Sequence, residues 1–172
     1  MRPKIIPNNN EKELDKNDFI VSKTDTRGII TYCNQIFMEM AEYEEKELIG
    51  VNHNIIRHPD VPKIAFKVLW QMIQSGQEFF GFVKNLRKSG GYYWVFANIM
   101  PDYDLNGKII GYTSVRRKPN PEALKTIIPL YQQLVSLEKT GGMNASLGAV
   151  TALLEEKNME FNELALALQG DM

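Results

Sequence analysis

The chain has 172 residues, of which 44% are hydrophobic and 24% charged, and its net charge is −1. This composition predicts one globular domain with an appendage and argues against a nucleic-acid binder, which would need a basic face. A single cysteine excludes an internal disulfide. No apolar run approaches the roughly 18 residues of a membrane span, and the N-terminus lacks the apolar core of a signal peptide. We therefore expect a cytoplasmic protein.

The N-terminal residues lead into a predicted hairpin. Residues 1–17 are polar and are interpreted as a flexible arm that precedes a folded domain at 18–119. Two β-prone runs, at 19–24 and 28–33, flank an Asp-Thr-Arg-Gly turn signal. They predict two antiparallel strands.

Helical signals follow the hairpin. Asn34 stands where a helix would be capped, ahead of apolar residues at helical spacing. A second short helix is predicted at 44–48, and Gly50 ends it. The longest apolar stripe of this region predicts a helix at 63–74.

Three further strands are predicted at 79–87, 92–100 and 108–117, joined by glycine-containing hairpin turns. Strands joined by tight hairpins form an antiparallel sheet. Because the helices come as one block between the second and third strands, they must cross one face of the sheet. The predicted fold class is therefore α+β, a five-stranded antiparallel sheet with helices on one face, and a small-molecule cavity between the two layers.

The C-terminal part is predicted to be helical. A helical connector is expected at 120–140, with a kink at Pro129, followed by a Gly-Gly hinge and an amphipathic helix at 143–169. Apolar residues of this last helix recur at alternating spacings of three and four, except at Lys157. The pattern is typical of a coiled-coil seam with a partner, and the alternative is that the helix packs back on its own sheet.

A rigid, charged bend lies between the short helices and the long one. Arg57, His58 and Asp60 fall within four residues, and Pro59 and Pro62 restrict the backbone around them. Charged groups on a rigid bend beside an apolar helix are typical of a pocket mouth. The alternative is that Asp60 only caps the long helix, with Pro62 in its first turn.

Three residues after the bend are candidates for the cavity wall. Phe66 and Trp70 are four residues apart on the long helix and share a face, either as cavity wall or as plain core aromatics. Asn85 lies on the third strand. If it points inward, its amide needs a ligand or a neighbour, since an unpartnered buried amide costs about 1–3 kcal/mol.

The spacing of these residues resembles the PAS domain of the bacterial aerotaxis receptor family, and that of stand-alone energy-taxis proteins of the CetB type, over roughly residues 18–120. The stretches that carry the resemblance are Asn-Ile-Ile-Arg-His-Pro-Asp at 54–60, Trp70, Val-Lys-Asn-x-Arg-Lys at 83–88 and Tyr-Trp-Val at 93–95.

The resemblance implies a PAS fold with C-terminal helices, and non-covalently bound FAD whose redox state is reported to chemotaxis signalling. It implies no catalytic residue and no metal. The implied flavin-site residues are Asn34, Arg57, His58, Asp60, Phe66, Trp70 and Asn85. The implied partners are a membrane-bound chemotaxis receptor, which would bring the protein to the inner membrane as a peripheral component, and a second copy in a homodimer.

Two other functions stay open. Haem is the rival cofactor, since His53 or His58 could serve as an axial ligand. A cofactor-free interaction module, working through its last two helices, is the rival class. An enzyme is not expected, because no nucleophile–base pair or metal-ligand cluster is apparent. A flavin photoadduct is not expected either, because Cys33 ends a strand and lies outside the helical segment beside the predicted pocket.

Overall fold

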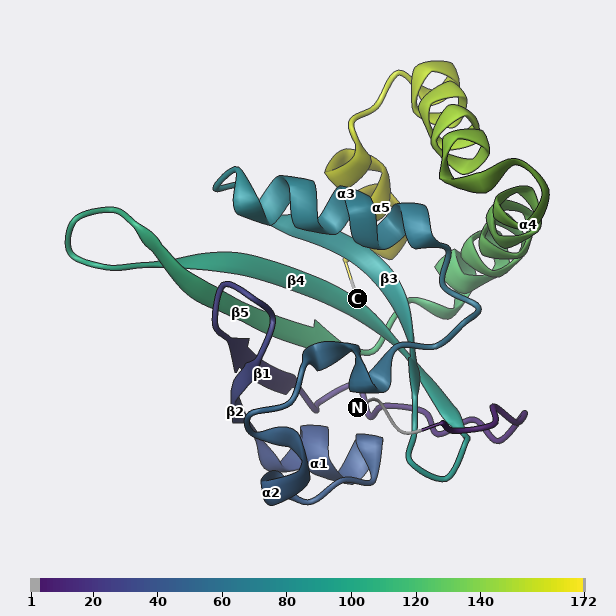
Figure 1. Ribbon diagram of the computed structural model, residues 1–172. Coiled ribbons are helices and arrows are strands. Elements are labelled where there is room, and N and C mark those ends of the chain that lie inside the picture. Colours follow the sequence, from purple (N-terminus) through teal and green to yellow (C-terminus); the bar gives the residue numbers. More distant parts are fainter. Residues whose placement is uncertain (1–3, 172) are drawn as a thin grey trace.

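The computed structural model describes residues 4–171 and is built around one antiparallel sheet (Figure 1). The spatial order β2-β1-β5-β4-β3 makes β2 and β3 the edges. The predicted α+β class is confirmed, and β4 and β5 extend together as a long hairpin beyond the rest of the sheet. The strands are β1 (Ile20–Thr24), β2 (Ile30–Cys33), β3 (Phe79–Leu86), β4 (Tyr92–Tyr103) and β5 (Ile109–Arg117).

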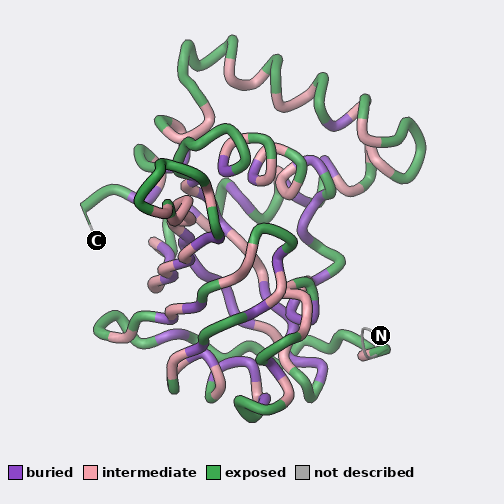
Figure 2. Tube along the Cα trace, turned by 60° about the vertical axis from the view of Figure 1, so that its left-hand side comes forward, coloured by how far each residue is buried: buried purple, intermediate pink, exposed green. Residues whose placement is uncertain are grey.

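One face of the sheet is covered by the helices between β2 and β3. Asn34 caps the first of these, because its side-chain oxygen accepts hydrogen bonds from the N–H groups of Phe37 and Val21, 3.1 Å away in both cases. Phe37 is fully buried behind it. The buried residues of this layer and of the facing strands run through the middle of the molecule (Figure 2). The covering elements are α1 (Gln35–Ala41), α2 (Glu45–Leu48), the 3₁₀ helix η1 (His53–Ile56) and α3 (Lys63–Gln74).

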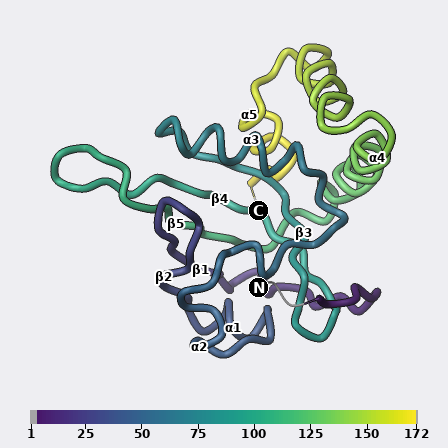
Figure 3. The backbone as a smooth tube through the Cα atoms, in the orientation of Figure 1, coloured from purple at the N-terminus to yellow at the C-terminus, as the bar shows by residue number. Residues whose placement is uncertain are grey.

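Residues 4–17 do not extend away from the domain as the predicted flexible arm would, and residues 1–3 of that arm lie outside the described part of the chain. It lies beside the turn between β3 and β4 (Figure 3). The N–H of Lys12 donates to the carbonyl of Tyr92 at 2.8 Å, and the N–H of Tyr92 donates to the carbonyl of Asn10 at 2.9 Å. Leu14 is only 2% exposed and belongs to the core. Strand-type pairing and one apolar anchor hold a segment whose polar composition suggested mobility.

The helix α4 (Pro121–Lys157) covers the other face of the sheet with its first half. The hydroxyl of Tyr131 donates to the carbonyl of Phe82 at 2.6 Å, and its ring lies 6.0 Å from that of Trp94. Pro129 lies within the helix, but the residue with non-helical dihedrals is Gly142, with φ 68° and ψ −169°. The main break therefore falls at the predicted Gly-Gly hinge, where glycine tolerates positive φ.

The predicted single helix at 143–169 is interrupted. Asn158 ends α4 in the left-handed conformation, with φ 52°, and α5 (Phe161–Gln169) begins three residues later. The side-chain amide of Asn162 pairs with the edge of β3, accepting from the N–H of Phe80 at 3.0 Å and donating to the carbonyl of Glu78 at 2.9 Å. The structure thus has the alternative arrangement, in which the last helix packs back on its own sheet.

The start of α3 is not capped by Asp60, as one interpretation of the sequence held. Pro62 occupies the N-cap position and has no side-chain acceptor. The carboxylate of Glu138, on α4, accepts hydrogen bonds from the N–H groups of Lys63 and Ile64 at 2.9 Å each, and from the hydroxyl of Ser146 at 2.9 Å. One carboxylate therefore joins the first turn of α3 to both halves of α4.

Candidate functional site

A cavity of about 290 Å³ lies between the inner face of the sheet and the layer formed by η1 and α3. Small-molecule sites have volumes from about 300 Å³ upward, so the size suits part of a ligand. Its walls are mostly apolar and its floor carries several polar side chains. The apolar wall includes Phe66, Leu69, Trp70, Ile73, Val83 and Ile99, and the polar groups include Ser22, His53, Asn85, Ser114 and Arg116.

The helix α3 supplies the aromatic wall. Phe66 and Trp70 both line the cavity, as their spacing predicts. The indole of Trp70 meets the ring of Tyr112 edge-on, with centroids 5.7 Å apart. On its other side lies Gly28, where a Cβ would come within 3.2 Å of the indole. The indole is therefore held between a strand and a turn, which fixes the wall of the cavity.

Arg116 is a buried cation at the polar end of the cavity. Its side chain is 3% exposed, its Nη2 donates to the hydroxyl of Ser22 at 2.6 Å, and its Cζ lies 4.5 Å from the ring centre of Phe37. Burial lowers the pKa of the guanidinium to about 10, so it remains charged at neutral pH. Its Nε and Nη1 have no hydrogen-bond partner among residues 4–171. A buried charge without a counter-charge is costly, and an electron-rich ligand would satisfy it.

His53 continues this polar network. Its Nε2 lies 3.0 Å from the hydroxyl of Ser22. Burial, and then the positive charge of Arg116, lower the pKa of His53 to about 3. Because Arg116 donates to Ser22, we assign the hydroxyl proton to a bond with Nε2 of a neutral imidazole. His53 is thus an uncharged group at the cavity surface at physiological pH.

Asn85 points into the cavity from β3 and is only 3% exposed. Its Nδ2 has no hydrogen-bond partner within the described part of the chain. Its backbone pairs with that of Arg57, which closes the edge of the sheet beside the cavity. The amide of Asn85 therefore points inward, which is the condition under which it needs a ligand or a neighbour, and it lies near the buried hydroxyl of Tyr93, which also has no hydrogen-bond partner among the described residues.

Arg57 stands at the mouth of the cavity, with its Cζ 4.0 Å above the ring of Phe66. Together with Phe66 and Trp70 it also lines a surface groove of about 670 Å³ that adjoins the cavity. Three lysines line this groove as well, with one acidic residue, Glu138, whose carboxylate is already bonded to α3. The groove is thus electropositive. The lysines are Lys63, Lys67 and Lys139.

Three of the residues predicted for the site have other positions. Asn34 caps α1 and also donates to the carbonyl of Phe19 at 2.8 Å. The Nδ1 of His58 accepts from the N–H of Asp60 at 3.1 Å, and its ring lies edge-on to Tyr92. The carboxylate of Asp60 bonds Lys84 at 2.7 Å, outside the cavity. These side chains shape the bend and the first helix, whereas Arg57, Phe66, Trp70 and Asn85 meet at the cavity.

Several cavity residues are not among those that the sequence predicts. Tyr112, Ser114 and Arg116 alternate along β5 and all face inward. An arginine at an inward position of a strand is the signal that could have identified Arg116. His53 was considered only as a haem ligand, and its contact with Ser22 depends on strand positions 31 residues away.

Substitution of Gly28 by alanine is expected to damage the site. Gly28 has φ +83°, and its new Cβ would meet the indole of Trp70 at 3.2 Å, whereas Gly107 has φ +78° and open space around it. Gly107→Ala should therefore cost about 1–2 kcal/mol for backbone conformation alone. Gly28→Ala should cost more and should also weaken ligand binding, measured by urea denaturation and by titration. Equal losses of stability and unchanged binding would contradict this position for the indole.

Two features are absent from residues 4–171. No group of three or more His, Cys, Asp or Glu side chains is arranged to hold a metal ion. No helix there is both long and apolar enough to cross a membrane.

Comparison with known proteins supports the fold described above. Residues 30–116 match the family model for the PAS fold. The aerotaxis receptor of Escherichia coli (strain K12) is 42% identical over 115 residues, which are 67% of this chain and 22% of that receptor. The nitrogen fixation regulatory protein of Klebsiella oxytoca is 28% identical over 97 residues, 56% of this chain and 20% of that protein. The chain thus spans about a fifth of these curated relatives.

Solved structures share the fold at lower identity. A light-oxygen-voltage domain studied with a flavin analogue superimposes with a TM-score of 0.57 at 22% identity, covering 67% of this chain and 86% of that one. The light-state structure of the blue-light photoreceptor Aureochrome1 LOV gives a TM-score of 0.57 at 20% identity, covering 66% and 90%. The family match extends over more than half of the sequence, and the resemblance to the aerotaxis receptor's PAS domain is confirmed. The chain therefore belongs to the PAS-fold family.

Proposed function

We propose that the cavity binds FAD non-covalently and that the protein is a non-catalytic redox sensor for aerotaxis or energy taxis. The observation that carries the proposal is the pair of unsatisfied buried donors, on Arg116 and Asn85, facing a cavity with aromatic walls. An isoalloxazine ring is flat and largely apolar, with carbonyl and nitrogen acceptors along one edge. Aromatic walls and inward donors are the complement of that shape.

The adjoining groove supports FAD over a shorter flavin. Arg57, Phe66 and Trp70 border both the cavity and the groove, so a ligand that fills the cavity can continue outward. Lysines are suited to a diphosphate, and Lys63, Lys67 and Lys139 line the groove. The adenosine diphosphate part of FAD would occupy this electropositive surface.

A bound flavin supplies reversible redox chemistry. The protein's part is to favour one charge state of the ring and to respond to the change. Arg116 favours the form with more negative charge, while the neutral His53 and the amide of Asn85 adjust their hydrogen bonds. We expect a graded shift of about 1–2 kcal/mol from one or two such contacts, because linkage limits the signal to their difference between states.

The signal would pass to a separate membrane-bound chemotaxis receptor by protein–protein contact. The similarity to the aerotaxis receptor covers 67% of this chain, which supports an energy-taxis role for the domain. The helix α3 carries Trp70, which lines the cavity, and its first turn is hydrogen-bonded to Glu138 of α4. These contacts support a path by which a change at the flavin would reach the surface. A movement of α3 would therefore reach the C-terminal helices.

The proposal is tested by the absorption spectrum of the purified protein and by loss of one donor. Asn85→Ala should weaken flavin binding by about 1–3 kcal/mol, or roughly 5- to 150-fold. Asn98→Ala is the matched control, because Asn98 lies on the neighbouring strand and outside the cavity. The expected result is flavin absorption in the wild type that is reduced or lost in the first variant only. A dominant Soret band would instead indicate haem, and colourless protein that does not take up FAD would indicate an interaction module.

A further inference from the structure

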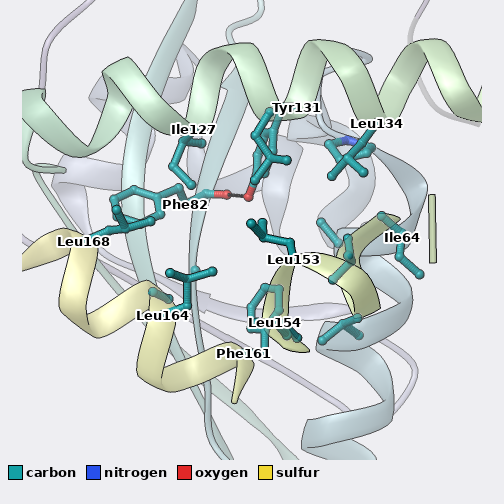
Figure 4. A pocket seen from close by; sticks show the side chains of 17 residues that line it. Ile64, Phe82, Ile127, Tyr131, Leu134, Leu153, Leu154, Phe161, Leu164 and Leu168 are labelled. Carbon is teal, nitrogen blue, oxygen red and sulfur yellow. Dashed lines mark hydrogen bonds between the residues drawn. The ribbon is translucent and has the colours of Figure 1, made fainter. Parts of the chain in front are cut away.

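A small apolar cavity lies on the far side of α3 and β3 from the candidate flavin cavity. Its volume is about 50 Å³, and it is bordered by α3, β3 and the two C-terminal helices, α4 and α5 (Figure 4). Neighbouring residues divide between the two cavities, because Ala65 and Phe82 line the small one whereas Phe66 and Val83 line the larger one. No residue among 4–171 lines both, so the small cavity is a separate feature of the fold.

The walls of this cavity offer a water molecule almost nothing to bond. Its surface is almost entirely apolar, and each lining residue is buried or half-buried. Among the lining residues, all of which lie within residues 4–171, only Tyr131 has a polar side-chain atom, and its hydroxyl already donates to the carbonyl of Phe82 at 2.6 Å (Figure 4). A buried water typically makes about three hydrogen bonds, which this cavity cannot supply. We therefore expect the cavity to exclude water.

The size of the cavity limits the molecules that fit inside it. In another protein, an engineered apolar cavity of about 150 Å³ stays dry and binds benzene or xenon. A cavity of about 50 Å³ is too small for a benzene ring but has room for one molecule of a few atoms. The side chains around a void lack dispersion contacts on one side. A small molecule without polar groups restores those contacts and gives up no strong hydrogen bond to water when it enters.

We propose that this cavity binds one molecule of an apolar diatomic gas, and that dioxygen is its ligand in the cell. Dioxygen has no dipole and interacts only weakly with water, so its transfer to an apolar site of matching size is favourable. A gas molecule bound there is separated from the larger cavity by α3 and β3 alone, since Phe66 and Val83 each follow a lining residue of the small cavity by one position. This inference does not depend on a bound flavin.

Xenon is the first probe, because it is apolar and inert and changes the NMR shifts of the methyl groups that it touches. Leu153 and Leu164 lie on the C-terminal helices and line the small cavity but not the larger one. Their methyl shifts should change with xenon pressure and reach saturation. The methyl groups of Ile20 and Leu48 are fully buried but line neither cavity, so they should show no saturable change.

Two alanines on the C-terminal helices give a matched pair of variants. Ala165 and Ala123 are both buried, but only Ala165 lines the cavity. In Ala165→Val the added methyl groups enter the void, so the saturable xenon shift should be lost. In Ala123→Val they meet packed atoms, so the xenon shift should remain while the urea midpoint falls below that of Ala165→Val. Val150→Ile, which adds one methylene from α4, is a second filling variant and should also weaken xenon binding.

Dioxygen itself is detected through its paramagnetism, which speeds the relaxation of nearby methyl protons. At equal pressures of dioxygen and dinitrogen, the added relaxation should be larger at Leu153 and Leu164 than at Ile20 and Leu48, and xenon should reduce the excess by competition. The proposal is overturned if wild type shows no saturable xenon shift at Leu153 and Leu164, or if that shift persists in both filling variants. Equal relaxation of all four residues by dioxygen would overturn it too.

Discussion

Arg116→Met is expected to stabilise the cofactor-free protein while weakening flavin binding and lowering the midpoint potential of the bound flavin. The guanidinium is buried, charged at neutral pH and bonded to Ser22, but its Nε and Nη1 have no partner in the described structure. Methionine keeps an unbranched apolar stem and removes the isolated charge, so the free energy of unfolding without cofactor should rise by about 1–3 kcal/mol. The potential should fall by about 60–130 mV for a one-electron step, the equivalent of one charge-assisted hydrogen bond.

The control for this variant is Arg117→Met, a substitution at the next residue of the same strand. Arg117 lies on the opposite face of β5, with its Cζ 5.4 Å from the ring of Phe96. Arg117→Met changes the net charge equally without entering the cavity, so the bound flavin should keep its potential. Spectroelectrochemistry measures the potentials and urea denaturation of cofactor-free protein measures stability. Equal potentials in the two variants, or a destabilised cofactor-free Arg116→Met, would remove Arg116 from the site.

A second large effect is expected from acid. The pKa of His53 is about 3 in the folded protein, against an ordinary value of 6.5, because burial and Arg116 oppose its charged form. Between these two values the unfolded chain binds one more proton, so the free energy of unfolding falls as pH falls, by about 1.4 kcal/mol per pH unit. The contribution becomes constant above about pH 7.5, where neither state binds this proton. Between pH 6.5 and 5, wild type should therefore lose about 2 kcal/mol through this residue.

His53→Asn isolates that contribution. The chain contains a second histidine, so the difference between wild type and variant is the informative quantity, and the slope of wild type alone is not. Carboxylates titrate mainly below about pH 4.5, which leaves the interval from 4.5 to 6.5 to histidine. Urea denaturation at pH 5 and pH 7 gives the two slopes. A variant that loses as much stability as wild type would show that His53 is not buried in its neutral form.

The parts of this molecule that could be predicted from sequence are those that depend on periodicity within one element. Phe66 and Trp70 share a face because they are four residues apart on a helix, and Asn85 points inward because strand residues alternate. The hairpin turns predicted which strands are directly connected. Because strands joined by tight hairpins run antiparallel, the turns also predicted the antiparallel sheet. The position of the cavity followed from the placement of the helices between the second and third strands.

The remainder depends on contacts between distant segments. Asp60 was a reasonable cap for α3, but Glu138 performs that role from 75 positions along the chain from Lys63. Asp60 instead bonds Lys84, which is 24 positions away on β3, and His58 accepts from the N–H of Asp60. The polar end of the cavity joins Ser22 to Arg116 across 94 positions, through the register of β1 with β5. The C-terminal seam was ambiguous because the same apolar stripe serves either arrangement.

The contacts of α4 also bear on where the domain ends as a cooperative unit. The family match stops at residue 116, yet Tyr131 satisfies the edge of β3 and Glu138 completes the first turn of α3. A fragment cut at the end of the match would expose the aromatic side of the sheet, including Phe82 and Trp94, which are buried beside α4. The folding unit is thus longer than the segment that the family model matches. A boundary drawn at the end of that match would divide a structure whose parts stabilise each other.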